Sequence, residues 1–245
     1  MTTLGVAIGT GNIWRFPRIA AQNEGGTFLI PFFVFLFTWS IPIMVVEFSM
    51  GRKTRGGVVK AVQSLIGPQY GWIGGFIGFC TMGIMFYYSV VVGWCLKYFW
   101  FSLVDGGAGQ DYAGYWQSFL ATGYEPVLFH SLAMTLGASI VFLGISKGIE
   151  RANKIFIPTL FSFLVIIALR AVTLPGAEAG LKFFFVPQWE SLSDHRIWLE
   201  AITQSAWSTG AGWGLFLTYS VYMRPRENVL RDSLLTGIGD GTASL

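Results

Sequence analysis

Charged residues are scarce in this sequence, and their scarcity excludes an ordinary soluble domain. Its 16 Lys and Arg and 13 Asp and Glu amount to 12% of 245 residues, well below the ~25% typical of soluble proteins. So few charges cannot cover a surface that faces water. The formal net charge of +3 is also too small to indicate a nucleic-acid partner.

Cysteine and histidine are rarer still, with two of each. Cys80 and Cys95 fall in one expected helix, whose rise of ~1.5 Å per residue separates them by more than ~20 Å. A disulfide between them is excluded if that helix forms. His130 and His195 lack ligand-like neighbours, so no metal site of the His/Cys type is predicted. No charged segment with a cleavage site precedes the first apolar stretch, and no secretory signal is predicted.

Apolar and small residues are abundant instead. Hydrophobic residues make up 53% of the sequence, with 31 Gly and 10 Trp, and the mean hydropathy is +0.56. Small residues let membrane helices approach closely, and Trp anchors helices at the lipid–water interface. The composition predicts a protein of the lipid bilayer.

Apolar stretches of the ~20 residues that cross a bilayer recur along the chain. We expect six spans and the start of a seventh, at residues 4–22, 28–51, 73–103, 127–145, 155–174 and 197–223, and from 229 onward. The predicted fold is therefore all-α and polytopic, with one transmembrane domain over residues 1–245.

The charged residues of the loops alternate in sign and predict an orientation. Bases follow the second, fourth and sixth spans: Arg52, Lys53, Arg55, Lys60, Lys147, Arg151, Lys154, Arg224, Arg226 and Arg231. The other loops are mainly acidic. By the positive-inside rule the basic loops are cytoplasmic, and so is the N-terminus.

The first span contains an irregular run, GTGNIWRFP, at residues 9–17. Asn12 and Arg15 lie at apparent bilayer depth, between two glycines and Pro17. Irregular backbone and a buried cation survive in lipid where they line a cavity or bind something. Helix packing through the glycines, with Arg15 snorkelling to the interface, is the alternative.

The sixth span has a comparable run, SAWSTGAGWG, at residues 205–214. A tightly packed, kinked helix is one interpretation. Two broken helices at equivalent places in two halves, however, are typical of inverted-repeat transporters. On that interpretation residues 1–175 form the first five-helix repeat, without the start of its first span, and residues 195–245 begin the second.

Several motifs together give the chain a resemblance to a known family. They are the two runs above, NEGGTFLIP at 23–31, EFSMGR at 47–52 and GISKGIER at 144–151. In this order they resemble the neurotransmitter:sodium symporter family, which includes the bacterial leucine transporter. That family has twelve spans, so we expect this chain to be its N-terminal half, beginning after the family's N-terminal gating arginine.

The resemblance implies two sodium sites. The first is matched by carbonyls and side chains of Ala7, Asn12, Ser208 and Asp240. The second is matched by the carbonyls of Gly5 and Ile8, with its other ligands on an eighth span. Such oxygen ligands suit a hard cation.

The resemblance also implies a substrate site and its supports. The matching substrate positions are Val6, Ala7, Gly11, Ile84, Tyr88, Trp207, Ser208, Gly210 and Trp213. In the family, the tyrosine at Tyr88 donates to the substrate carboxylate, and Trp207 takes the place of an aromatic lid. Arg15 matches an external gate, and Glu47 matches an acid that braces the broken sixth span. Gly9 replaces the aspartate of amine carriers, so an amino acid is the implied substrate.

Chloride dependence follows from a further set of positions. Those that match an anion site in chloride-dependent relatives read Phe32, Gln204, Ser208 and Ser244, and Asp240 lies one helical turn before Ser244. A fixed carboxylate there neutralises sodium directly and repels a second anion. We expect transport that does not need chloride.

These observations predict a partial chain of a sodium-coupled amino-acid symporter that works by alternating access in the plasma or inner membrane. Its partners are an amino acid and lipid, with no nucleic acid; a homo-oligomer stays open. An enzyme is disfavoured because no nucleophile–base pair is apparent. The alternative is a non-transporting membrane protein, either a binding or assembly partner or a pseudogene product.

Overall fold

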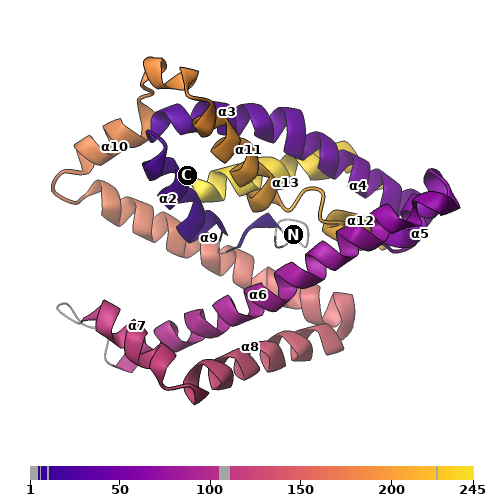
Figure 1. Cartoon of the computed structure of the whole chain (residues 1–245), viewed down its shortest axis with the longest axis horizontal. Coiled ribbons are helices and arrows are strands. Elements are labelled where there is room, and N and C mark those ends of the chain that lie inside the picture. Colours follow the sequence, from indigo (N-terminus) through magenta and orange to yellow (C-terminus); the bar gives the residue numbers. More distant parts are fainter. Residues whose placement is uncertain (1–4, 6, 10, 105–110, 225) are drawn as a thin grey trace. The chain divides into compact units, whose positions relative to one another are not determined.

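The computed structural model describes residues 5, 7–9, 11–104, 111–224 and 226–245, and in these it is all-α with no strand (Figure 1). This confirms the predicted fold class. Short π- or 3-10-helical segments carry the prefix η. The elements are η1 (Gly11–Arg15), α2 (Phe16–Gln22), α3 (Gly26–Phe35), η2 (Leu36–Ser40), α4 (Ile41–Thr54), α5 (Val58–Leu65), η3 (Pro68–Tyr70), α6 (Gly71–Val104), α7 (Tyr112–Ala121), α8 (Tyr124–Phe142), η4 (Ile145–Ile149), α9 (Glu150–Val172), α10 (Ala177–Phe185), η5 (Trp189–Ser193), α11 (His195–Thr209), α12 (Leu215–Ser220) and α13 (Val229–Ser244).

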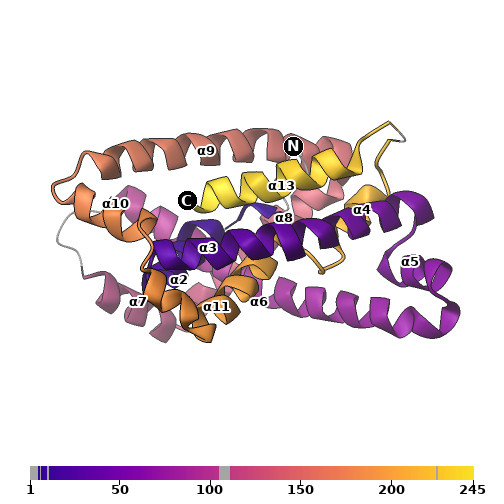
Figure 2. The same ribbon diagram turned by 90° about the horizontal axis from the view of Figure 1, so that it is seen from above.

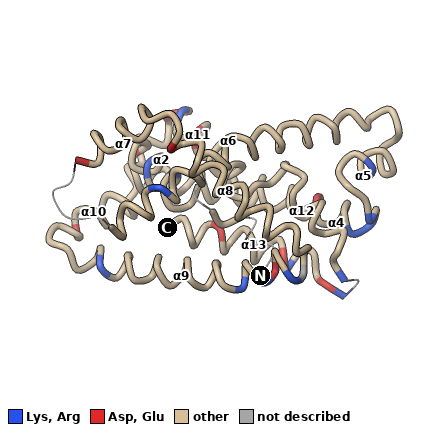
Figure 3. Tube along the Cα trace, turned by 90° about the horizontal axis from the view of Figure 1, so that it is seen from below, with Lys and Arg blue, Asp and Glu red and all other residues tan. Residues whose placement is uncertain are grey.

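Four helical stretches of the described chain are long and apolar enough to cross a membrane. They are Gly26–Thr54, Pro68–Val104, Tyr124–Phe142 and Lys147–Val172, and they coincide with the second to fifth predicted spans. Figure 3 shows the tube of α6 without acidic or basic colour over most of its length. The first and sixth predicted spans fall instead on shorter, interrupted helices, so the count of six spans stays a prediction.

The chain divides into two compact units. One comprises Met1–Gly78 and Asn153–Leu245, and the other comprises Phe79–Ala152. The predicted boundary near residue 175 separates two repeats of the sequence rather than two compact units, and it stays a prediction. The units are described separately below.

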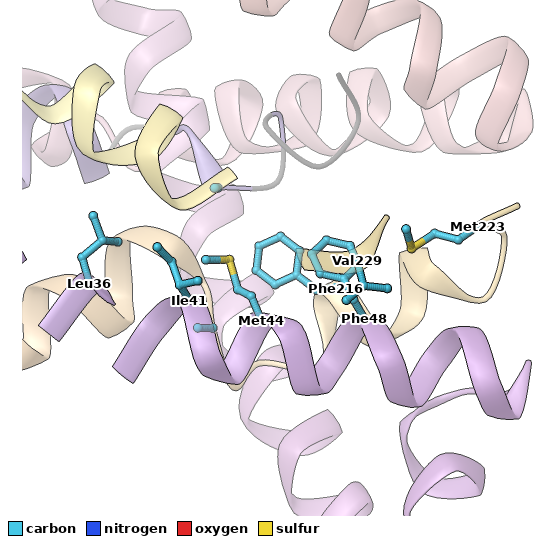
Figure 4. Packing of buried hydrophobic residues seen from close by; sticks show 9 residues of the cluster. Leu36, Ile41, Met44, Phe48, Phe216, Met223 and Val229 are labelled. Atoms are coloured by element: carbon cyan, nitrogen blue, oxygen red, sulfur yellow. The ribbon is translucent and has the colours of Figure 1, made fainter. Parts of the chain in front are cut away.

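In the first unit, the main helix contacts are those of α4 and of α3. It packs against α12 and α13, while α3 packs against α11, and Figure 2 shows α13 running alongside α4. Apolar side chains fill the contact; Met44, Phe48 and Phe216 are fully buried there (Figure 4). The rings of Phe48 and Phe216 lie 5.2 Å apart.

A second apolar cluster of this unit joins α2, α3 and α11. Phe16, Phe28 and Phe32 are fully buried in it. The ring of Phe16 meets that of Phe32 edge-on, with 4.8 Å between centroids. This cluster holds α2 directly after η1 and so fixes one side of the interrupted first span.

The second unit contains most of α6, with α7, α8 and η4. Gly93 of α6 lies against the backbone of His130 on α8, because a Cβ built on Gly93 would come within 2.8 Å of the His130 nitrogen. Lys97 forms an ion pair with Glu125 at 2.7 Å. Cys80 and Cys95 are both free and exposed on α6.

Candidate functional site

The first interruption lies at η1, a π-helical turn of five residues. Such turns are rare in helices and are frequent at functional sites. Gly11 and Asn12 are buried in it, and Pro17 stands in the first turn of α2, where its missing N–H removes no helical bond. The irregular sequence run therefore contains a real change of helix geometry at Gly11–Arg15.

The second interruption lies between α11 and α12. Gly210, Gly212 and Gly214 have φ of 67°, 89° and 73°, a backbone region in which residues with a Cβ are strained. Their alternation with Ala211 and Trp213 explains why the sequence breaks here. The helix ends at Thr209 and resumes at Leu215.

Glu47 of α4 holds this second interruption together. Its Oε1 accepts hydrogen bonds from the backbone N–H groups of Gly212 at 2.7 Å and Gly214 at 3.2 Å. Its Oε2 accepts one from Leu217 at 3.3 Å. Backbone N–H groups freed by a helix break need such partners when buried, and Glu47 supplies them.

A buried polar cluster joins the two interruptions to α13. Asn12 Nδ2 lies within hydrogen-bond distance of Ser208 Oγ (3.1 Å), Asp240 Oδ1 (2.7 Å) and Ser244 Oγ (2.8 Å). Ser208 Oγ donates to the same Oδ1 at 3.0 Å. Asn12 Oδ1 accepts from the backbone of Gly9 at 2.8 Å. Three segments far apart in sequence thus meet through four side chains.

Asp240 is the centre of that cluster and is 0% exposed. The ion pairs of the described residues are Lys97–Glu125 and Asp194–His195, so among them no basic side chain pairs with Asp240. Its Oδ2 has no hydrogen-bond partner in the same residues. A buried carboxylate is costly unless a cation or donors compensate it, so this site suits a cation.

Arg15 is the last residue of η1. Its Nη1 donates to Oε1 of Gln204, and its guanidinium lies 5.4 Å from the ring centre of Trp207. Trp207 in turn meets Trp213 edge-on at 5.1 Å. Gly11 faces this pair, because a Cβ there would lie 3.6 Å from Cδ1 of Trp207.

The structure places the residues predicted from the sequence in different parts of the chain. The structure brings together Asn12, Ser208, Asp240 and Ser244, and beside them Gly11, Trp207 and Trp213. Ala7 and Ile8 are buried just before η1. Ile84 and Tyr88 lie on α6 in the second unit, where Tyr88 contacts the ring of Tyr87; Val6 lies outside the described residues.

Two contacts were missed by sequence reasoning. Gln204 accepts a hydrogen bond from Arg15, and its expected place at an anion site stays a prediction. Ser40 and Ser205 form a buried hydroxyl pair at 2.9 Å between η2 and α11. Neither contact has a signal in the sequence beyond a polar residue in an apolar stretch. Phe32, another residue expected at the anion site, belongs to the apolar cluster of α2, α3 and α11.

Comparison with known proteins decides the family. The model of the sodium:neurotransmitter symporter family matches residues 1–118 and 126–245. The chain belongs to this family. The matched family is one of sodium symporters rather than of enzymes.

Relatives of this symporter-family chain include archaeal and mammalian proteins. An uncharacterized sodium-dependent transporter of Methanocaldococcus jannaschii is 34% identical over 96% of this chain and 50% of its own length. The mouse sodium-dependent neutral amino acid transporter B(0)AT3 is 28% identical over 100% of the chain and 44% of its own. The chain spans about half the length of the curated relatives that it matches.

A solved structure supports the same conclusion. The crystal structure of MhsT in complex with L-phenylalanine matches 99% of this chain and 56% of that protein, with a TM-score of 0.90 and 30% identity. This symporter-family chain therefore shares the fold of the part of MhsT that it matches.

Proposed function

We propose that this chain supplies the first ion site and much of the substrate site of a sodium-coupled amino-acid symporter. The family supports sodium-coupled transport. The relatives named for neutral amino acids and the MhsT complex with L-phenylalanine support an amino-acid substrate. The observation that carries the proposal is the buried Asp240 carboxylate between the two interrupted helices.

The residues around Asp240 suit sodium. The cluster offers a carboxylate, the hydroxyl of Ser208 and the amide of Asn12, which are the hard oxygen donors that such cations take. Asn12 presents Nδ2 to Asp240, so a half-turn of the amide would direct Oδ1 to the cation. The carbonyl of Ala7 completes the proposed set, and the carbonyls of Gly5 and Ile8 belong to the proposed second site.

The same arrangement links ion and substrate. Ser208 belongs to the proposed sodium site and lies two residues before Gly210, where the second interruption begins. Val6, Ala7, Gly11, Trp207, Gly210 and Trp213 would line the proposed substrate site. Because Ser208 and Ala7 serve both ligands, binding of one favours binding of the other.

In the proposed symporter, Arg15 is the external gate and Glu47 is the residue that braces the second interruption. Arg15 would close the site from outside, with Trp207 beneath it. Glu47 keeps the second interruption in its bent form through three backbone hydrogen bonds. We place the N-terminus on the cytoplasmic side of the plasma or inner membrane, from the basic loops.

We also propose that chloride is not required. Asp240 already supplies the negative charge that balances sodium, and a chloride ion beside it would be repelled in a site without bulk water. The loss of a hydroxyl at Phe32 removes one anion ligand. Asp240 thus replaces the negative charge that a bound chloride ion would otherwise supply.

Uptake of labelled neutral amino acids tests the proposal. The complete reading frame that contains this chain is reconstituted in vesicles, with an inward gradient of sodium or of choline. We expect uptake above background with sodium alone, and its loss in Asp240→Leu. The control is Asp232→Asn, a change near the start of the same helix. Equal uptake in sodium and choline would overturn the proposal.

A further inference from the structure

One face of α13 carries polar side chains along its length and is fully buried. Ser233, Thr236 and Asp240 are 0% exposed and Ser244 is 4% exposed. Intervals of three and four residues place them on a single helix face. The face therefore extends from the cluster at Asp240 toward Val229, the first residue of α13.

Three oxygen atoms on this face lack a hydrogen-bond partner. They are Ser233 Oγ, Thr236 Oγ1 and Asp240 Oδ2, three of the five such buried atoms in the described residues. Buried polar atoms without partners are rare in folded proteins, and a group of them indicates an ion or water. Their alignment on one helix face makes this group a candidate site.

The hydroxyls of Ser233 and Thr236 do not donate to the backbone carbonyls of the preceding helical turn. On the same helix, Thr242 Oγ1 donates to the carbonyl of Ile238 at 2.8 Å, and Ser244 Oγ donates to that of Asp240 at 3.0 Å. Ser233 and Thr236 make no such bond. Their oxygens are therefore turned away from the helix's own carbonyls.

The spacing of the three oxygens suits water. At ~1.5 Å per residue, successive positions are ~4.5–6 Å apart along the helix axis. A water with two hydrogen bonds of ~2.8 Å spans a comparable distance. Beside Thr236 the surroundings are apolar, because Gly237 faces the side chains of Ile41 and Met44. Buried water needs two or more polar partners, and the face supplies them in series.

We propose that Ser233 and Thr236 hold a file of internal water that connects Oδ2 of Asp240 to the Val229 end of α13. The inference rests on the proposed sodium site and places this end on its cytoplasmic side. The file supplies oxygen ligands in turn to a sodium ion that enters or leaves Asp240. It controls the rate of sodium exchange and leaves the equilibrium affinity to the ligands around Asp240.

Sodium exchange in hydroxyl variants tests the file. Thr236→Val keeps the shape of the side chain and removes the oxygen, Ser233→Ala does the same one turn away, and Thr242→Val is the control. Purified protein from the complete reading frame is loaded with radioactive sodium and diluted into sodium-free buffer. We expect Thr236→Val and Ser233→Ala to slow sodium release several-fold and to leave the equilibrium affinity for sodium unchanged. Rates like those of the control would overturn the proposal.

Thermal unfolding without sodium gives a second, independent measurement. Where water bonds to the Thr236 hydroxyl, valine leaves that water short of a partner, and the melting temperature falls. Where the hydroxyl is dry, valine removes an unpaired polar group and the melting temperature rises, which would overturn the proposal. A wild-type protein that retains no sodium contradicts the proposed sodium site, and this measurement still decides whether the file exists.

Discussion

Asn12 on η1 and Asp240 on α13 are joined by a hydrogen bond of 2.7 Å across 228 positions of sequence. The bond connects the interrupted first span to the last helix of the chain, and Ser208 of α11 donates to the same carboxylate oxygen. Any change at one of these residues therefore reaches all three helices. The predictions below begin from this cluster.

Replacing Asn12 with leucine keeps much of the volume and removes every polar bond of the amide. We expect Asn12→Leu to weaken sodium binding and amino-acid binding together, since ligands that share a site are linked reciprocally. Both affinities are measured on the purified complete protein, with Ile13→Leu, a change of the exposed neighbour, as the control. Unchanged sodium dependence in Asn12→Leu would count against Asn12 as a sodium ligand.

Glu47→Gln tests the brace at the second interruption. Glutamine replaces one acceptor oxygen with an NH₂ group, so at least one of the N–H groups of Gly212, Gly214 and Leu217 loses its partner. A buried donor left unpaired costs about 1–3 kcal/mol. We expect a lower melting temperature than for Glu178→Gln, an exposed glutamate on α10. Equal melting temperatures for the two variants would show that the brace is unimportant for stability.

Lys97 offers a separate test within the second unit. Its ammonium pairs with Glu125 and lies 5.3–5.6 Å from the rings of Tyr115, Phe119 and Phe129. A desolvated cation over such rings is stabilised by about 2 kcal/mol. We therefore expect Lys97→Met to lower the melting temperature.

The partner residue supplies the control for that prediction. Lys97→Met leaves the Glu125 carboxylate unpaired, whereas Lys97→Met with Glu125→Met removes both charges. Removing one member of a partly buried pair costs more than replacing the pair with apolar residues. The double variant should melt at a higher temperature than the single one. The reverse order would show that the charge pair is not coupled.

The sequence predicts the apolar elements and both interruptions well, because these depend on local properties. Runs such as 28–51 and 73–103 are long and carry one charged residue each, so only a membrane or a large core could accept them. The glycines at 210, 212 and 214 disfavour a continuous helix wherever they occur. These signals need no knowledge of tertiary structure.

The contacts of the polar residues could not be predicted in the same way. Gln204 and Ser205 are neighbours in sequence, yet one contacts Arg15 and the other Ser40. Which partner each takes depends on how α11 packs against η1 and η2. The unpartnered hydroxyls of Ser233 and Thr236 likewise appear only when their whole surroundings are known, since most serines and threonines on helices bond to the preceding turn.

Equilibrium binding of radioactive sodium to the purified complete protein, with chloride or with gluconate as the anion, tests the central claim about Asp240. We predict that the wild type and Asp232→Asn bind sodium equally well in both anions. Asp240→Asn removes the fixed charge with little change of shape, so it should bind sodium far more weakly in gluconate and recover when chloride is added. Tight sodium binding by Asp240→Asn in gluconate, or a wild-type protein that needs chloride to bind sodium, would contradict the account.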